Sequence, residues 1–160
     1  MNYFKIEGKI KMRIFVTEFA ESKKEIEREL KPKTENIIEH LFKLYLVPGH
    51  TAVNHWKQEI YSFLHTIDKL KGSNKRPSKK QLYDWTFGKK EDLFDEDYYT
   101  EGMIETIKYT YNVNITADTF EVNESMFQIC KSYFTWLAEI LSEKGIIVPR
   151  QVYNKLNELL

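Results

Sequence analysis

Hydrophobic and polar residues alternate along the first seventeen positions of the chain. Apolar residues occupy the even positions from 4 to 16, interrupted by Gly8, while Lys, Glu and Arg occupy the odd positions from 5 to 13. This period of two predicts a strand with one buried face and one solvated face. Gly8 favours a hairpin with a three-residue loop at 7–9, which sets Ile6 opposite Ile10 on a continuous apolar face. We therefore predict a β-hairpin element over residues 1–20.

From Ser22 onward, hydrophobic residues recur at the three- and four-residue spacings of amphipathic helices. Ser22 and Glu25 form a capping box for a short helix that Pro32 should end, and Thr34 is placed to cap the next helix. The clearest helical pattern runs from residue 53 to residue 70. Its narrow apolar face predicts that a partner helix packs against it at a shallow angle. Further helices are predicted over 34–47, from Ser78 to Gly88, from Tyr98 to Tyr111, from Glu124 to Lys144 and from Pro149 onward.

Two short segments fit more than one structure. Residues 113 and 115 can pair with residues 122 and 120 across a turn at 117–118, which favours a hairpin over 113–122. Thr119 or Asn123 is equally well placed to cap a helix there. Residues 146–148 predict a brief extended piece before the last helix.

These elements predict a mainly α protein that consists of a bundle of about six helices and a small N-terminal β-hairpin. The hairpin alone would bring the fold to the border of the α+β class. The 160 residues suit a single domain, with the hairpin over 1–20 and the bundle over 21–160. An isolated hairpin is marginal in water and needs a third strand or the edge of a second copy. A homodimer through the N-terminal β element is therefore one prediction. Alternatively, Met12 is the true start and the first eleven residues are a weakly structured extension.

Composition narrows the class of protein. With 42% hydrophobic residues the chain can bury a core, and 24 basic against 24 acidic residues leave no global charge to attract nucleic acid or an anionic membrane. The single cysteine excludes an internal disulfide and suits a reducing compartment. No apolar run has the length of a signal peptide or a membrane span, so we expect a cytoplasmic protein without a membrane partner.

The histidines offer one candidate metal site. His50 precedes the helix that carries His55 and Glu59, and the last two are four residues apart on one helical face. A further ligand from the preceding helix, such as Glu39 or His40, would complete a site like those inside helical bundles. The alternative interpretation is a partly exposed polar face with a helix salt bridge, and it is the one we favour. A metal-dependent bundle enzyme is therefore kept only as the third hypothesis.

Other signs of catalysis are missing from the sequence. Cys130 stands on the apolar side of its helix, where a thiol behaves as a small core side chain. The chain has no phosphate-binding glycine loop, no Gly-x-Ser-x-Gly elbow and no HExxH pair. We accordingly predict no catalytic residue and no cofactor.

The segment from Lys69 to Lys80 carries six basic residues and no acidic one. Its lysines surround the predicted helix start at Ser78, and helix N-termini attract anions. Helix, basic loop and helix also have the outline of a helix-turn-helix, although the connection is long and the second helix presents apolar residues. We favour a solvated loop whose lysines pair with acidic residues of the same molecule or of a partner. The alternative is that the chain is a nucleic-acid-binding accessory protein. The phosphate contacts would then come from Lys75, Arg76, Lys79 and Lys80.

Aromatic residues flank an acidic stretch that runs from Glu91 to Glu105. Tyr and Trp contribute large contact areas at protein interfaces, although a short bundle also fills its core with such rings. The working hypothesis is a small intracellular helical protein that acts by binding another protein. The candidate partner-binding residues are Tyr83, Trp85, Tyr98 and Tyr99.

Overall fold

The computed structural model describes residues 3–70, 72–142 and 149–160, with side chains for 23–70, 72–142 and 150–160. All regular structure in these ranges is helical, and no strand occurs in them, so the mainly α prediction is confirmed. Six helices within these ranges have nine or more residues, where the sequence predicts about six. The helices are α1 (Tyr3–Leu46), α2 (Val53–Lys69), α3 (Lys79–Phe87), the short α4 (Asp92–Asp95), α5 (Tyr98–Tyr111), α6 (Thr119–Ser142) and α7 (Pro149–Leu159), with a 3-10 turn η1 (Lys89–Glu91).

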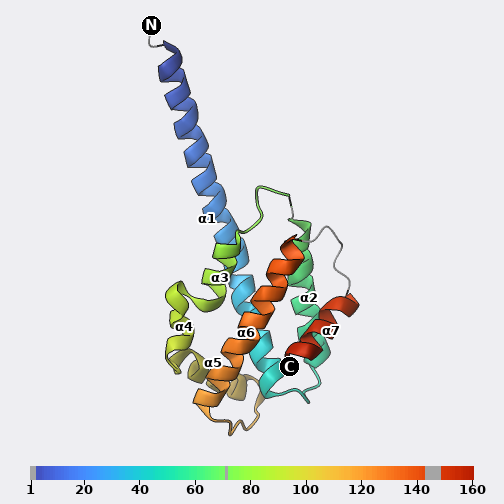
Figure 1. Ribbon diagram of the computed structural model, residues 1–160. Helices are drawn as coiled ribbons and strands as arrows, with labels where there is room; N and C mark the ends of the chain where they lie inside the picture. Colours follow the sequence, from blue (N-terminus) through green and yellow to red (C-terminus); the bar gives the residue numbers. More distant parts are fainter. Residues whose placement is uncertain (1–2, 71, 143–148) are drawn as a thin grey trace.

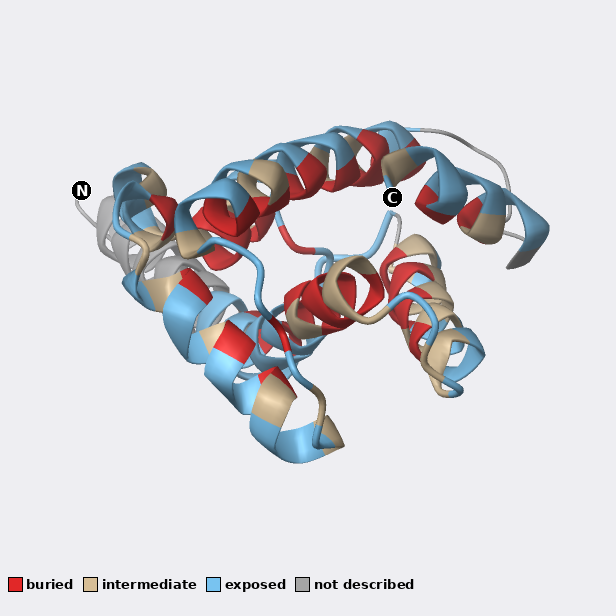
Figure 2. Ribbon diagram, turned by 90° about the horizontal axis from the view of Figure 1, so that it is seen from below, coloured by how far each residue is buried: buried red, intermediate tan, exposed pale blue. Residues whose placement is uncertain are grey.

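The helices surround one hydrophobic core (Figure 1). The C-terminal half of α1 contacts α2, α3, α5 and α6, and α7 packs against α2 and α6. Buried residues lie on the helix faces that turn toward the centre of the bundle (Figure 2). Among the described residues, no helix is both long enough and apolar enough to cross a lipid bilayer. The largest fully buried side chains include Phe42, Ile60, Leu64, Phe87, Ile107, Met126 and Tyr133.

The predicted N-terminal hairpin is wrong, because residues from Tyr3 onward belong to α1. The alternating segment also satisfies a helical period, since apolar residues stand at 6, 10 and 14 and again at 12, 16 and 19. Lys, Arg and Glu are good helix formers, and Gly8 costs a helix only about 1 kcal/mol. A helix also closes its hydrogen bonds locally, whereas a hairpin would need a third strand. The edge-paired homodimer consequently has no strand to use among the described residues.

Pro32 does not end a helix, contrary to the prediction of two separate helices on either side of it. The proline removes one backbone hydrogen bond at a cost of about 3 kcal/mol. Ile26 and Leu30 before it and Ile37 after it are nevertheless buried in the same core, so packing on both sides holds α1 continuous. Thr34 is buried inside this helix, and its hydroxyl donates to the Leu30 carbonyl at 2.9 Å instead of capping a new helix.

The second predicted hairpin, over 113–122, is also wrong. Residues 113–118 are irregular and α6 begins at Thr119, as the alternative interpretation allowed. Asp118 is the capping residue, since its carboxylate accepts a hydrogen bond from the Glu121 amide at 3.1 Å. Val122, one of the proposed strand residues, is buried on the inner face of α6. The extended piece predicted at 146–148 lies outside the described residues.

The predicted capping box at the start of α3 is confirmed. The Ser78 hydroxyl accepts from the Gln81 amide at 3.1 Å, and the Gln81 side chain accepts from the Ser78 amide at 2.9 Å. Helix α5 has the predicted bounds, and α2 and α7 begin where the pattern placed them. Local signals and core periodicity therefore agree over these segments.

Asn123 links three helices from within the core. Its side-chain oxygen accepts a hydrogen bond from the Thr100 hydroxyl of α5, and its amide nitrogen donates to the Phe94 carbonyl of α4 at 3.0 Å. We expect Asn123→Ala to lower the free energy of unfolding by about 2 to 4 kcal/mol, because it leaves two buried polar groups without partners. Urea denaturation would measure this. Gln128→Ala, an exposed change on the same helix, should stay within about 0.5 kcal/mol of wild type, and equal losses in both variants would contradict the bridging role.

Candidate functional site: a groove between α1 and α5

Two neighbouring hollows form a groove on the surface where α5 lies beside α1. Their volumes are about 520 and 410 Å³, and both are lined by Tyr99 and Met103. Because these residues are shared, the two hollows adjoin each other beside α5. The remaining lining residues are Pro32, Glu35, Asn36 and Glu39 of α1 and Tyr98, Glu101, Gly102 and Thr106 of α5.

The floor of the groove is apolar and firmly held. Tyr99 and Met103 are half-buried and pack against the hydrophobic core. The Tyr99 ring meets the rings of Phe42 and Phe94 edge-on, with centroids 6.0 and 5.6 Å away. Edge-to-face pairs of this kind fix ring orientation. The floor is therefore preorganised for a ligand that brings apolar side chains.

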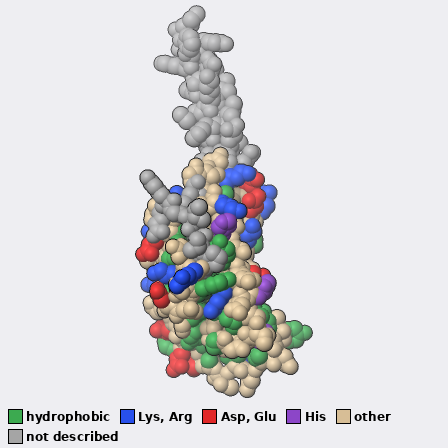
Figure 3. Space-filling view, turned by 90° about the vertical axis from the view of Figure 1, so that its right-hand side faces the viewer, with side chains coloured by type: hydrophobic (Ala, Val, Ile, Leu, Met, Phe, Trp, Pro, Cys, Tyr) green, Lys and Arg blue, Asp and Glu red, His purple; other side chains and the backbone are tan. Residues whose placement is uncertain are grey.

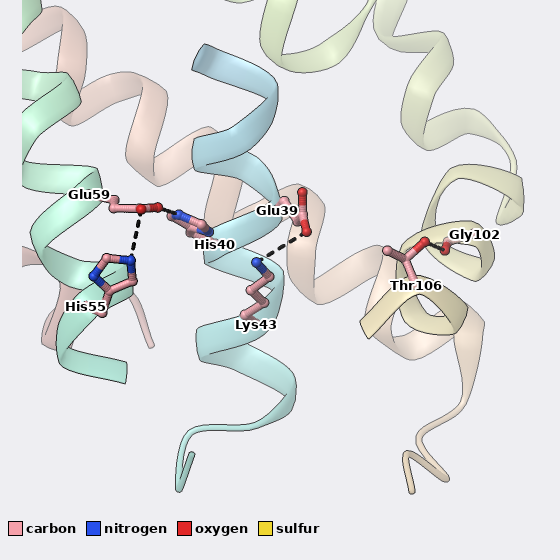
Figure 4. A network of polar contacts seen from close by, with 7 residues as sticks. All are labelled: Glu39, His40, Lys43, His55, Glu59, Gly102 and Thr106. Carbon is pink, nitrogen blue, oxygen red and sulfur yellow. Dashed lines mark hydrogen bonds and ion pairs between the residues drawn. The ribbon is translucent and has the colours of Figure 1, made fainter. Parts of the chain in front are cut away.

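The outer face of α5 carries an exposed stripe beside the groove. Tyr98 is 83% exposed and Tyr109 is 91% exposed, and a spacing of eleven residues brings both onto one helical face. Gly102 and Thr106 lie between them, and the Thr106 hydroxyl donates to the Gly102 carbonyl at 2.9 Å (Figure 4). A side-chain methyl at Gly102 would meet no atom within 4 Å. The glycine thus leaves open space at the centre of the stripe.

The rim of the groove is acidic. Glu35 and Glu39 stand on the α1 side and Glu101 on the α5 side. Burial raises the pKa of the Tyr99 hydroxyl, and the nearby Cys130 thiol and the Glu35 and Glu39 carboxylates add to this shift. The rim continues into the acidic stretch 91–105, which contains no basic residue. An apolar floor under a negative rim suits a cationic, amphipathic ligand.

Behind Glu39 lies a buried lysine. The Lys43 ammonium is 3.2 Å from the Glu39 carboxylate, and it sits over the rings of Trp56 and Tyr111 at 5.7 and 5.2 Å from their centroids. Burial opposes its charge, but a hydrogen bond to Tyr111 and the attraction of Glu39 outweigh this and raise the pKa of Lys43. Lys43 therefore stays charged inside the bundle and holds Glu39 at the groove rim.

Glu59 joins two histidines from different helices (Figure 4). It contacts His40 of α1 through one carboxylate oxygen and lies 3.0 Å from the His55 imidazole through the other. Because a carboxylate only accepts, His40 Nε2 carries the proton, and Nδ1 is buried without a partner among the described residues. Burial lowers the pKa of His40 below its ordinary 6.5 despite the hydrogen bond to Glu59. Burial opposes the charge of Glu59, but the bond to His40 prevails and lowers the Glu59 pKa.

The depressed His40 pKa makes stability depend on pH. The unfolded chain takes up a proton near pH 6.5, whereas the folded chain does so only at lower pH. The stability due to neutral His40 is therefore complete above about pH 6.5 and is lost as the pH falls below it. Between pH 7.5 and 5.5 we expect the Tm to fall by a few degrees more in wild type than in His40→Gln, which keeps a donor for Glu59 but does not titrate. Parallel Tm curves by circular dichroism would contradict this.

The three residues of the predicted metal site are not brought together. His50 stacks on Trp56, with ring centroids 5.3 Å apart, and its Nδ1 accepts a hydrogen bond from the Ala52 amide at 3.0 Å. His55 and Glu59 do meet, but as an exposed histidine beside a half-buried carboxylate on α2. Within the described ranges, no three His, Cys, Asp or Glu side chains are arranged to hold a metal ion.

The four predicted partner-binding aromatics separate into two places. Tyr98 and Tyr99 line the groove. Trp85 is buried in the core, and the Tyr83 hydroxyl donates to Glu91 while its ring packs on Phe87 and Phe134. The hydrogen bond to Glu91 raises the pKa of Tyr83 to about 12. The alternative interpretation of core filling is thus correct for Trp85 and largely correct for Tyr83.

The predicted phosphate-binding residues lie at the other end of the bundle. Lys75, Arg76, Lys79 and Lys80 are all exposed around the start of α3. Arg76 lines a hollow of about 450 Å³ together with Lys23 of α1. Leu82 and Trp85, which a reading helix would point at bases, are buried. On the face formed by α2 and α7, charges of both signs are mixed with hydrophobic side chains (Figure 3).

The groove contains residues that sequence reasoning did not single out. Gly102 and Thr106 follow Tyr98 at four-residue spacings on one face of α5, and this signal was present in the sequence. Nothing local indicates that Glu35 of α1 lies opposite that face. Comparison with protein-family models, curated proteins and solved structures gives no match. The described residues define a mainly α bundle with an acidic groove between two helices.

Proposed function

We propose that the protein binds a basic, amphipathic segment of another protein in the groove between α1 and α5. The observation that supports this most is the 83% exposure of Tyr98 at the edge of an apolar hollow whose rim is carboxylate. Tyrosine is enriched at protein interfaces, where it contributes a large contact area. Apolar side chains of the partner would cover Tyr99 and Met103, and its lysines or arginines would face Glu35 and Glu101. This is the helix-in-groove mode of recognition.

Designed peptides test the proposal without knowledge of the natural partner. The probe is a fourteen-residue amphipathic helix of leucine and lysine, and the matched control replaces every lysine by glutamate. Titration followed by NMR of the Met103 methyl group should show saturable shifts with the basic probe only. Equal binding of both peptides, or of neither, would overturn the proposal.

A pair of variants tests whether the basic probe binds at the groove. Tyr98→Ala should weaken binding of the basic probe about tenfold, because a buried aromatic anchor contributes 1 kcal/mol or more at an interface. Tyr109→Ala removes an equally exposed tyrosine of α5 that lines neither hollow and should leave affinity unchanged. If both variants bind like wild type, the groove is not the binding surface.

Gly102 provides a test in which stability and binding move in opposite directions. Gly102→Ala should raise the free energy of unfolding by about 0.5 to 1 kcal/mol, because alanine favours the helix and meets no atom there. The added methyl group enters the hollow, so affinity for the basic probe should fall. Thermal unfolding and the same titration measure the two effects. A variant that is more stable and binds unchanged would contradict a role for the open space.

Nucleic acid is the competing outcome. The exposed cluster around Lys79 and Lys80 would contact phosphates, and such binding weakens steeply with added salt. If random duplex DNA binds at low salt, is lost in Lys79→Ala/Lys80→Ala, and the basic peptide does not bind, the protein-binding proposal is overturned in favour of a nucleic-acid role.

A further inference from the structure

We propose that the hollow between α1 and the loop joining α2 to α3 binds a small molecule that carries a phosphate group on a ring. Its volume is about 450 Å³, and small-molecule pockets span about 300 to 1,000 Å³. Lys23 and Ile26 line it from α1, and Asn74, Arg76 and Pro77 line it from the loop. The inference does not rest on the proposed function, because this hollow shares no lining residue with the groove.

The charge around the hollow is of one sign. Lys23 and Arg76 come from two different segments, and no acidic side chain is among the described residues of the lining. Lys75, Lys79 and Lys80 are exposed nearby in the sequence. None of these five basic side chains forms an ion pair with another described residue. A concave surface with uncompensated positive charge attracts anions.

The backbone that carries Arg76 is held on both sides. The Ser73 amide donates to the Leu70 carbonyl at 3.0 Å, and the Arg76 amide donates to the Ser73 carbonyl at 3.3 Å. Pro77 follows and is buried, and the capping box of Ser78 ends the loop. A guanidinium on such a fixed backbone can present two parallel N–H groups to a phosphate.

The hollow also offers contacts for the rest of a ligand. Ile26 is 7% exposed, and together with the buried Pro77 it supplies apolar surface at the lining. The Asn74 side chain has no hydrogen-bond partner among the described residues, so its amide is available to a polar group. Apolar surface and a free amide beside two cations favour a phosphate carried on a ring over inorganic phosphate.

Three ligands of graded chemistry test the proposal on the full-length chain. The probe is adenosine monophosphate, and the controls are adenosine, which lacks the phosphate, and inorganic phosphate, which lacks the ring. Isothermal titration calorimetry should show saturable binding of the probe, at least tenfold weaker binding of inorganic phosphate and no binding of adenosine. Failure of both adenosine monophosphate and phenyl phosphate to bind would overturn the proposal. Equal affinity for inorganic phosphate would overturn the role of the ring.

Single variants locate the binding. Lys23→Ala and Arg76→Ala should each weaken binding of adenosine monophosphate about tenfold, because each removes a charge-assisted contact to the phosphate. Arg76→Lys keeps the charge but loses the paired N–H groups, and it should also bind more weakly than wild type. Lys80→Ala is the matched control, because Lys80 is exposed at the start of α3 and does not line the hollow. It should stay within about twofold of wild type at about 0.15 M salt, which screens exposed charges.

The outcomes separate this site from the other candidates. If Lys80→Ala weakens binding as much as Arg76→Ala, the ligand senses only the basic surface, and the hollow is not a site. If random duplex DNA displaces the probe and its own binding depends on Lys80, the surface belongs to nucleic acid. Tyr98→Ala should bind adenosine monophosphate like wild type, since Tyr98 lines only the groove. A loss in that variant would contradict the placement of the ligand at this hollow.

Discussion

Lys43→Glu is expected to prevent stable folding at 25 °C. The substitution puts a carboxylate beside Glu39 and over the electron-rich faces of Trp56 and Tyr111, in a position only 7% exposed. An uncompensated buried charge costs about 4 kcal/mol or more, and small domains have only about 5 to 15 kcal/mol of total stability. Far-ultraviolet circular dichroism and urea denaturation of the purified variant would measure the loss.

Lys43→Met separates the charge from the packing. Methionine keeps most of the aliphatic stem against the two rings, and water can reach Glu39, which is about one third exposed. We expect this variant to stay within about 1.5 kcal/mol of wild type, because the Glu39 carboxylate gains water in place of its partner and an ion pair to a partly exposed carboxylate contributes only about 1 kcal/mol or less. Similar stabilities for the Glu and Met variants would show that Lys43 is not enclosed as described.

Phe87→Ala is expected to cost about 3 to 5 kcal/mol. Phe87 is fully buried at the end of α3. Its ring centroid lies 4.6 Å from that of Tyr83 and 5.7 to 6.1 Å from those of Phe94, Phe127 and Phe134. Truncation to alanine leaves a cavity that these rings, held by three helices, cannot fully close. Chemical denaturation followed by tryptophan fluorescence measures the change.

Phe120→Ala is the matched control for the aromatic cluster. Phe120 is 60% exposed on the first turn of α6, so its truncation should change the unfolding free energy by no more than about 0.5 kcal/mol. If Phe87→Ala costs as little as this control, the cluster does not connect α3, α4 and α6 in the way that the ring contacts indicate.

Most of the helices could be predicted because independent local signals agree. Helix α3 has a capping box at Ser78 and a stop at Gly88, and α2 has a narrow hydrophobic face. The prediction of an N-terminal hairpin was wrong because the apolar positions of this segment satisfy periods of both two and four residues. The prediction that Pro32 ends a helix was wrong because core packing on both sides of the proline outweighs the lost hydrogen bond. Such packing is a tertiary effect and is not visible in a short stretch of sequence.

The candidate site was predictable only on one side. The acidic stretch and Tyr98 with Tyr99 were visible as a cluster in the sequence, and both tyrosines line the groove. Trp85 is also an aromatic residue near the acidic stretch, but it faces the core. It shares the buried face of α3 with Leu82 and Phe87. Glu35 became part of the site only through the packing of α1 against α5, which joins residues more than sixty positions apart.

Cys130 gives the chain a built-in reporter of unfolding. It is the single cysteine, its side chain is completely enclosed in the core, and burial raises the pKa of its thiol to about 12. Thiol reagents react with the thiolate, so modification has to wait until α6 separates from its neighbours. The rate at which a disulfide reagent labels the native protein therefore counts opening events directly, without any engineered probe.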